Sequence, residues 1–335
     1  MDFLKDIVKE IGDEYTQLAR DIEGRERFVD TGSFIFNGLV SGSIFGGVSS
    51  NKITAIAGES STGKTFFSLA VVKNFLDSNP DGYCLYFDTE AAVNKPLLES
   101  RGIDLDRLVV VNVVTIEEFR TKALKAVDKY IKMSEEDRKP CMFVLDSLGM
   151  LSTEKEITDA LNDKQVRDMT KSQLVKGAFR MLTLKLGQAN IPLIVTNHTY
   201  DVIGSYVPTK EMGGGSGLKY AASTIIYLSK KKEKDQKEVI GNIIKAKTHK
   251  SRLSKENQEV NIRLYYDERG LDKYYGLLEL GEIGGMWKNV AGRYEIQGKK
   301  IYAKEILRNP TEYFTDDIMK ELDGIAKSVF SYGTN

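Results

Sequence analysis

A glycine-rich octapeptide between two apolar segments constrains the fold of this chain more than any other feature. Residues 58–65 have the sequence GESSTGKT, which fits the pattern G-x-x-x-x-G-K-[ST] of a phosphate-binding loop. Residues 52–57 before the loop predict a short buried strand, and residues 65–76 after it carry apolar side chains at helical spacing. A strand, a glycine loop and a helix N-terminus direct backbone N–H groups and the helix dipole toward an anion. The sequence therefore predicts a bound nucleoside triphosphate.

The loop also predicts which groups touch the nucleotide. We expect Lys64 to reach the β- and γ-phosphates and the Thr65 hydroxyl to bind Mg²⁺, so the predicted cofactors are ATP and Mg²⁺. The predicted phosphate-binding set consists of Gly58, Glu59, Ser60, Ser61, Thr62, Gly63, Lys64, Thr65 and Phe66.

Beyond the loop, strands and helices alternate along the chain. Strands are predicted at 82–90, 108–114, 141–147 and 192–198, and helices at about 116–132 and 170–189. Buried strands that alternate with helices predict an α/β fold with a mainly parallel sheet and helices on both faces. After Ala221 the pattern changes to successive strands joined by polar turns, which would extend this sheet. From Leu271 onward the chain is predicted to be smaller, mixed and partly helical.

The N-terminal segment and the composition narrow the class of protein. Residues 3–22 have helical periodicity with one apolar stripe, which covers either this chain's own core or a neighbouring subunit. Lys plus Arg equals Asp plus Glu at 48 each, so a nucleic-acid site must be a local patch. No run approaches the roughly 20 apolar residues of a membrane helix. Cys84 and Cys141 fall in predicted interior strands, where we expect small buried side chains and neither zinc nor a disulfide, in a reducing cytoplasm.

Three predicted strands end in polar groups that would meet near the loop, because ligands gather at the carboxyl ends of parallel strands. Asp146 suits binding of Mg²⁺ through water, and Glu90 suits activation of a water that attacks the γ-phosphate. His198, with Asn197 beside it, could detect whether that phosphate is present. A capped strand end explains any one of these residues, but three around one phosphate loop favour a catalytic site.

Two polar segments leave the same predicted sheet edge. Residues 199–217 lack periodicity, contain two tyrosines and one lysine, and end in a glycine cluster, while residues 158–168 form a second polar loop. Long loops of this kind are often functional, and their aromatic side chains can stack on bases. Two surface loops without a function remain the alternative.

Two clusters of basic residues follow. The cluster at 230–234 predicts a solvated hairpin turn, whereas Lys250 and Arg252 could point at the phosphate of another subunit.

Several segments together resemble the RecA family of recombinases, and within it most closely the UvsX-type branch of T-even-like phages. They occur in family order from about Val29 to Gly281 and include CLYFDTE, FVLDSLGML, IPLIVTNHTY, EMGGGSGLKYAAST and YYGLLELG. The resemblance implies a RecA-like ATPase core at 29–270. It also implies an oligomerisation helix within 1–28 and a small α+β domain at 271–335.

The resemblance assigns roles to single residues. Residues 58–65 would hold the ATP phosphates, and Ser147 would also bind the nucleotide. Asp146 would belong to the Mg²⁺ shell, and Glu90 would activate water. His198 would link the γ-phosphate to the second of two DNA loops, near 159–167 and 199–214. Lys250 and Arg252 would complete a neighbour's ATP site. Leu97 stands where relatives often place a tyrosine near the adenine. The implied DNA-binding residues are Lys164, Arg167, Thr199, Tyr200, Tyr206, Lys210, Gly213 and Gly214.

The implied function is ATP-dependent DNA strand exchange. The chain would form helical filaments on single-stranded DNA, pair that strand with homologous duplex DNA, and act with mediator and single-strand-binding proteins. It would do so away from membranes, in the cytoplasm of a host cell if a phage encodes it. A ring-forming helicase motor and a non-catalytic, ATP-gated regulator of recombination are the two alternatives.

Overall fold

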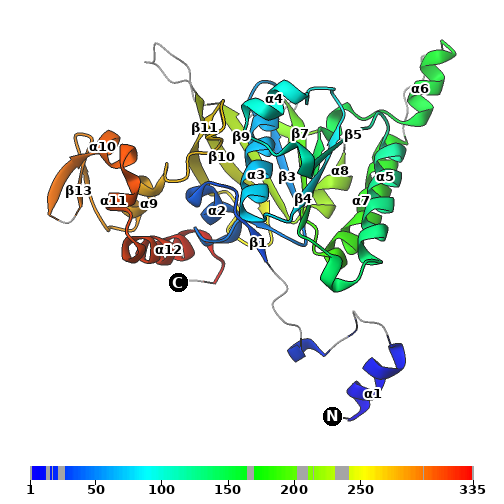
Figure 1. Cartoon of the computed structure of the whole chain (residues 1–335), viewed down its shortest axis with the longest axis horizontal. Helices are drawn as coiled ribbons and strands as arrows, with labels where there is room; N and C mark the ends of the chain where they lie inside the picture. Colours follow the sequence, from blue (N-terminus) through cyan, green and yellow to red (C-terminus); the bar gives the residue numbers. More distant parts are fainter. Residues whose placement is uncertain are drawn as a thin grey trace.

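A large sheet forms the centre of the computed structural model, which describes residues 2–12, 16, 18–21, 27–163, 170–201, 210–213, 215–230, 241–296 and 298–333. Its strand order is β11-β10-β9-β3-β7-β6-β4-β5, and β8 pairs with β7 outside this path. Figure 1 shows this sheet with helices around it. The strands are β3 (Ile53–Gly58), β4 (Tyr83–Asp88), β5 (Leu108–Asn112), β6 (Cys141–Asp146), β7 (Leu193–Asp201), β8 (Lys210–Met212), β9 (Thr224–Lys230), β10 (Gly241–Ser251) and β11 (Glu259–Tyr265).

The direction of the strands confirms the predicted fold class. Neighbouring strands from β9 through β3, β7, β6 and β4 to β5 are parallel. β10 and β11 then extend the sheet in antiparallel fashion. Because the parallel strands share one direction, their carboxyl ends lie at one edge of the sheet, and this edge carries the phosphate loop.

Helices cover both faces of the sheet because successive strand residues point to opposite sides. Ile56 and Tyr86 belong to the hydrophobic cluster on one face, whereas Ala55 and Phe87 belong to the cluster on the other. The first face carries α2 (Phe34–Ser41), α3 (Lys64–Ser78) and α4 (Lys95–Ser100). The second face carries α5 (Ile116–Ile131), α7 (Lys171–Ala189) and α8 (Ser216–Ala221). Cys84 and Cys141 are both buried, in β4 and β6.

The C-terminal segment is mixed and small, as predicted, and lies beside the antiparallel end of the sheet (Figure 1). Its last helix packs on the core, since the Phe330 ring would lie 3.3 Å from a Cβ at Gly38. One hydrophobic cluster includes residues on both sides of residue 270, so the core continues into this segment. The segment contains α9 (Leu277–Ile283), β12 (Asn289–Val290), β13 (Arg293–Ile296), β14 (Lys299–Tyr302), α10 (Ala303–Arg308), α11 (Pro310–Tyr313) and α12 (Asp316–Phe330).

The N-terminal helix is shorter than its periodicity predicts. α1 spans Asp2–Ile11 and ends where Gly12 adopts φ +68°, a left-handed conformation that terminates helices. A 3₁₀ turn follows at Ala19–Asp21, and β1 (Phe28–Val29) pairs with β2 (Val48–Ser49). Phe3, Leu4 and Ile11 are exposed, so these side chains of the apolar stripe are not buried against the described part of the chain. No described helix combines the length and apolar composition needed to cross a bilayer.

Candidate active site

The phosphate loop has the geometry that its glycines predict. Gly58 ends β3, and a Cβ at this position would lie 2.7 Å from the Leu228 carbonyl oxygen, closer than a side chain tolerates. Gly63 caps α3 with φ +91°, a conformation that other residues rarely adopt. Glu59, Ser60 and Ser61 are exposed between them. The loop therefore presents its backbone to solvent at the N-terminus of a 15-residue helix, where anions bind favourably.

Lys64 lies at the bottom of this loop with its side chain directed inward. Its Nζ donates hydrogen bonds to the carbonyl oxygens of Gly58 at 3.0 Å and Glu59 at 2.8 Å. Burial lowers the pKa of this ammonium, and the nearby carboxylates of Asp146 and Glu90 oppose that shift. A triphosphate would supply negative charge to this poorly solvated cation.

Asp146 ends β6 beside the loop and is held by two hydroxyl groups. Tyr86 donates to Asp146 Oδ2 at 2.7 Å, and Thr196 donates to Asp146 Oδ1. The Tyr86 hydroxyl also lies 3.1 Å from Ser68 Oγ, which lies 2.9 Å from the Thr65 carbonyl oxygen. Because Tyr86 gives its one proton to Asp146, Ser68 donates either to the Tyr86 oxygen or to the Thr65 carbonyl oxygen. These polar contacts hold the first turn of α3 beside the acid of β6.

The oxygen atoms at this point fit a magnesium ion that nucleotide phosphates help to hold. The Thr65 hydroxyl makes no hydrogen bond within the described part of the chain, and each Asp146 oxygen keeps a lone pair for a water. No cluster of three or more His, Cys, Asp or Glu side chains able to hold a metal occurs among the described residues. Mg²⁺ in nucleotide sites is held by few protein groups, so this donor set is sufficient.

Glu90 and His198 lie on the other side of the loop, from β4 and β7. Ser147 Oγ donates to Glu90 Oε1 at 2.8 Å, and His198 Nε2 faces the same oxygen at 3.5 Å. His198 Nδ1 lies 3.4 Å from Lys64 Nζ. Because an ammonium can only donate, this contact assigns Nδ1 as the acceptor and places the ring proton on Nε2. The three predicted residues therefore form a chain from Lys64 through His198 to Glu90.

Two residues that the sequence did not single out position Glu90. The buried Asp88 carboxylate accepts the backbone N–H groups of Glu90 at 3.0 Å and Val93 at 3.1 Å. Thr89 Oγ1 accepts the Ser147 N–H at 2.8 Å and donates to the Asp146 carbonyl oxygen at 3.1 Å. These bonds fold the turn after β4 back onto the end of β6. The sequence signal that could have identified this turn was Asp88, the acidic residue two positions before Glu90.

The second predicted DNA loop begins as a hairpin and not as an irregular loop. β7 continues to Asp201 and pairs with β8, with Thr199 opposite Met212 and Tyr200 opposite Glu211. The prediction was wrong here because strand pairing depends on partners 9 to 13 residues away, which local periodicity does not reveal. The Thr199 side chain is buried and Tyr200 is 59% exposed.

The base of this hairpin is tied to the phosphate loop. Asn197 Nδ2 donates to the Gly213 carbonyl oxygen at 2.8 Å, and the Gly213 N–H donates to the His198 carbonyl oxygen at 3.0 Å. Lys210, the first residue of β8, forms an ion pair with Glu59. Tyr206 and Gly214 lie outside the described residues.

The first predicted DNA loop is also partly regular. α6 (Glu154–Leu161) extends into the segment that was predicted as a loop from residue 158. A capping box between Thr153 and Glu156 starts this helix, a signal that the sequence analysis missed. Lys164 and Arg167 lie outside the described residues.

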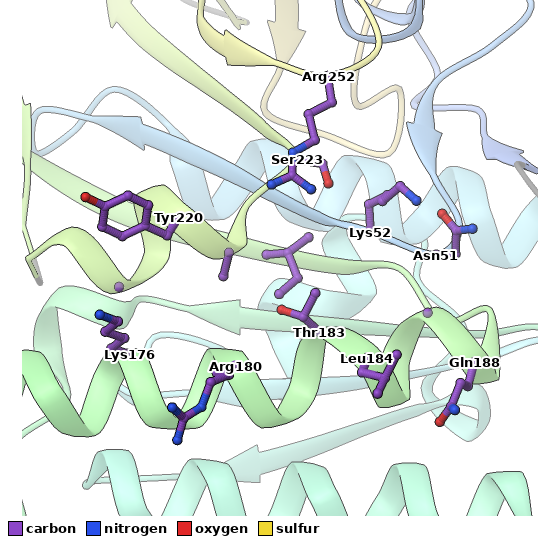
Figure 2. Close-up of a pocket in the computed structure, with 14 residues that line it drawn as sticks. Asn51, Lys52, Lys176, Arg180, Thr183, Leu184, Gln188, Tyr220, Ser223 and Arg252 are labelled. Carbon is purple, nitrogen blue, oxygen red and sulfur yellow. The ribbon is translucent and has the colours of Figure 1, made fainter.

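Lys250 and Arg252 lie far from the phosphate loop of the same chain. Lys250 Nζ donates to the carbonyl oxygens of Lys219 at 2.6 Å and Ala222 at 2.8 Å, which caps the C-terminus of α8. Arg252 enters a cavity of about 670 Å³ near Ile53, at the beginning of β3 (Figure 2). Its guanidinium group has no hydrogen-bond or ion-pair partner among the described residues.

This cavity, which we call the basic pocket, is positively charged. Lys52, Lys176 and Arg180 line it together with Arg252, and Tyr220 lies at its rim (Figure 2). None of the described residues that line it carries a carboxylate. Gly58 at the other end of β3 lies five residues from Ile53, which corresponds to about 17 Å at 3.3 Å per residue. The basic pocket and the phosphate loop therefore lie at opposite edges of the sheet.

Leu97 stands where relatives often place a tyrosine, but other aromatic side chains lie beside the phosphate loop. Leu97 packs against the core, and next to the loop Phe66 lies between Arg101 and Tyr266. The Arg101 guanidinium carbon is 4.2 Å from the Phe66 ring centroid, and the Phe66 and Tyr266 centroids are 5.4 Å apart. Burial lowers the pKa of Arg101.

Comparison with known proteins agrees with this geometry. The sequence model of the RecA N-terminal domain matches residues 2–272. The recombination and repair protein of Enterobacteria phage T4 is 35% identical over 284 residues, which cover 84% of this chain and 71% of that protein. Protein RecA of Cereibacter sphaeroides is 30% identical over 275 residues, which cover 79% and 76% respectively. Protein RecA of Rickettsia africae is 29% identical over 288 residues, which cover 83% and 79%.

Proposed function

The chain belongs to the RecA family, and from this premise we propose that it is an ATP-dependent recombinase. It polymerises on single-stranded DNA, pairs that strand with homologous duplex DNA, and exchanges strands with DNA-stimulated ATP hydrolysis. The name of the phage T4 relative, a recombination and repair protein, supports this function.

The observation that carries the proposal is the contact between the nucleotide site and the hairpin. Lys64 lies 3.4 Å from His198, and the next residues of β7 pair with β8. When a γ-phosphate occupies the loop, Lys64 turns from the loop carbonyl groups to the phosphate, and its contact with His198 changes. The β7–β8 hairpin starts one residue later, so a nucleotide-dependent shift of His198 alters the segment proposed to bind DNA. Thr199, Tyr200, Lys210 and Gly213, with Lys164, Arg167, Tyr206 and Gly214, form the proposed DNA-binding set.

Hydrolysis is assigned to the groups around this loop. Residues 58–66 bind the phosphates of ATP. Thr65 and Asp146 would hold Mg²⁺, which would neutralise charge that develops on the phosphate oxygens. Glu90 accepts a proton from the attacking water, and the Ser147 hydroxyl keeps its carboxylate oriented. His198 Nε2 lies 3.5 Å from the same carboxylate oxygen.

The phosphate loop and the basic pocket lie at opposite edges of the sheet, and this separation supports head-to-tail assembly. Arg252 lines a pocket with Ile53, which lies about 17 Å along β3 from Gly58 in the phosphate loop, so it completes a nucleotide site only in another copy. Lys250 would bind the same phosphates, and its Nζ would then donate to phosphate oxygens in place of the carbonyl oxygens at the end of α8. An interface between two different edges of one chain is heterologous and generates an open helix.

The remaining parts of the proposal concern organisation and partners. α1, within residues 1–28, contacts a neighbouring copy through its apolar stripe, and residues 271–335 form a small domain on the outside of the core. Single-strand-binding proteins compete for the same DNA, so a mediator protein that loads the filament belongs to the proposal. The protein acts in the cytoplasm, which for a phage protein is that of the host.

Electron microscopy with single-stranded DNA and a slowly hydrolysed ATP analogue tests the assembly. We expect long helical filaments for the wild type and none for Lys64→Ala, whose loop lacks the phosphate ligand. Closed rings or isolated particles in the wild type would contradict the proposal. Arg252→Ala tests the shared site: isolated subunits should bind nucleotide normally, while turnover on DNA falls at least tenfold. A strand-exchange assay with homologous and heterologous duplexes tests the reaction itself.

A further inference from the structure

The ion pair between Glu59 and Lys210 joins the phosphate loop to the hairpin independently of His198. Glu59 is the one acidic residue within the loop at 58–65, and Lys210 is the first residue of β8. The two side chains are 57% and 42% exposed. An ion pair that is this accessible to water is weak, so either partner exchanges readily with another charged group.

The backbone of Glu59 contacts the lysine that is proposed to bind the phosphates. Its carbonyl oxygen accepts hydrogen bonds from Lys64 Nζ at 2.8 Å and from Thr62 Oγ1 at 2.9 Å. A bound triphosphate withdraws Lys64 from this carbonyl group and places several negative charges close to the Glu59 carboxylate. Like charges at short distance repel, so the carboxylate is driven away from the loop. The residue that holds Lys210 is therefore the residue that nucleotide displaces.

We propose that Glu59 is a positioning residue that holds Lys210 at the phosphate loop until nucleotide arrives. In the empty site the ion pair keeps Lys210 from DNA phosphates. With triphosphate bound, Lys210 is released and contacts the DNA backbone. This inference rests on the proposed function, since it requires that the hairpin binds DNA. It adds a second link between nucleotide and DNA, through charge competition.

The effect is measured as the affinity for fluorescent single-stranded DNA, without nucleotide and with a saturating, slowly hydrolysed ATP analogue. We expect Glu59→Gln to bind DNA about two- to fivefold more tightly than the wild type without nucleotide, as the loss of an exposed ion pair implies. The two proteins should converge when nucleotide fills the loop. The ratio of the two affinities therefore falls in the variant.

Salt dependence provides a readout that a change in loop structure would not reproduce. Each additional phosphate contact on single-stranded DNA steepens the slope of log K against log salt by about 0.7. Without nucleotide, Glu59→Gln should show a slope about 0.7 steeper than the wild type. The wild type should gain the same increment when the analogue is added.

Glu211→Gln is the matched control, because it removes the same charge from the residue next to Lys210, and Glu211 pairs with a different lysine. Glu211 is 65% exposed and pairs with Lys219 at 3.2 Å, away from the loop. We expect it to change DNA affinity equally in both nucleotide states. In a Lys210→Gln background, Glu59→Gln should have no further effect without nucleotide, since the cation it released is absent.

Three results would overturn the proposal. Glu59→Gln leaves the affinity ratio at the wild-type value, or it acts equally with and without Lys210, or Lys210→Gln weakens nucleotide binding in the absence of DNA. The last result would mean that Lys210 moves to the triphosphate. A wild type whose DNA affinity does not depend on nucleotide would refute the proposed function. Even in that case, the DNA affinities of Glu59→Gln and the wild type, both measured without nucleotide, show whether the ion pair restrains Lys210.

Discussion

Tyr86→Phe isolates the hydrogen bond that orients Asp146. The Tyr86 side chain is fully buried, and its hydroxyl donates to Asp146 Oδ2 at 2.7 Å. Phenylalanine keeps the ring, so the substitution removes one oxygen without opening a large cavity. A hydrogen bond to a charged group contributes about 1.5–3 kcal/mol, against about 0.5–1.5 kcal/mol for a neutral pair. We therefore expect the free energy of unfolding to fall by about 1.5–3 kcal/mol.

Tyr130→Phe provides the comparison. The Tyr130 hydroxyl donates to the Lys139 carbonyl oxygen at 2.9 Å, which is a neutral hydrogen bond at the end of α5. Its removal should cost about 0.5–1.5 kcal/mol. Equilibrium unfolding in urea measures both variants, and equal slopes against urea show that the two unfolding reactions are comparable. A cost for Tyr86→Phe no larger than that for Tyr130→Phe would refute the charged hydrogen bond.

The same variant tests the proposed metal role of Asp146. After Tyr86→Phe, Thr196 alone restrains the carboxylate by a hydroxyl group. Groups that orient metal-binding side chains typically change metal affinity about 10–100-fold when they are lost. We expect the Mg²⁺ concentration for half-maximal ATP turnover to rise about tenfold in Tyr86→Phe and to stay unchanged in Tyr130→Phe. An unchanged Mg²⁺ dependence in both variants would separate Asp146 orientation from metal binding.

Three further predictions follow from named contacts. Burial lowers the pKa of Lys64, and the ammonium form binds phosphate, so nucleotide affinity should fall as pH rises, starting below the ordinary lysine pKa; calorimetry from about pH 7 to about pH 10 measures it. Affinity that stays flat across this range would contradict the buried ammonium. Gly58→Ala should abolish nucleotide binding and cost about 1–3 kcal/mol in unfolding experiments, because its Cβ would lie 2.7 Å from the Leu228 carbonyl oxygen. Phe330→Ala should destabilise the core by about 3–5 kcal/mol, since the ring packs beside Gly38; a melting transition confined to residues 271–335 would show instead that this segment folds separately.

Local sequence patterns predicted the elements that carry the loop. The strand and the helix around residues 58–65 were predicted within two residues, because burial in a parallel sheet and helical spacing leave regular patterns. The end of β6 at Asp146 was predicted for the same reason, whereas β4 ends at Asp88, two residues before Glu90, and β7 continues past His198 to Asp201. Asp88 and Thr89 were missed, since turns that cap a strand have no periodicity.

Three secondary-structure predictions made from local sequence patterns were wrong. The apolar stripe at 3–22 predicted one helix, but Gly12 ends it because its φ of +68° is incompatible with helical backbone. The segment from Thr199 lacks periodicity, yet its first residues pair with β8. The start of α6 at Thr153 was hidden in a polar stretch that only its capping box identifies.

The octapeptide alone was sufficient to predict a nucleotide-binding α/β protein, since glycines at two positions and Lys64 between strand and helix have few other uses. The distances between segments far apart in the chain were decided by folding. The parallel register of β3 with β7 brings Gly58 beside His198. The length of β3 separates Arg252 from the phosphate loop. The return of β8 along β7 carries Lys210 to Glu59. These contacts depend on how distant strands pair. The free energy of that pairing depends on the whole sheet, so the sequence of a single segment does not predict it.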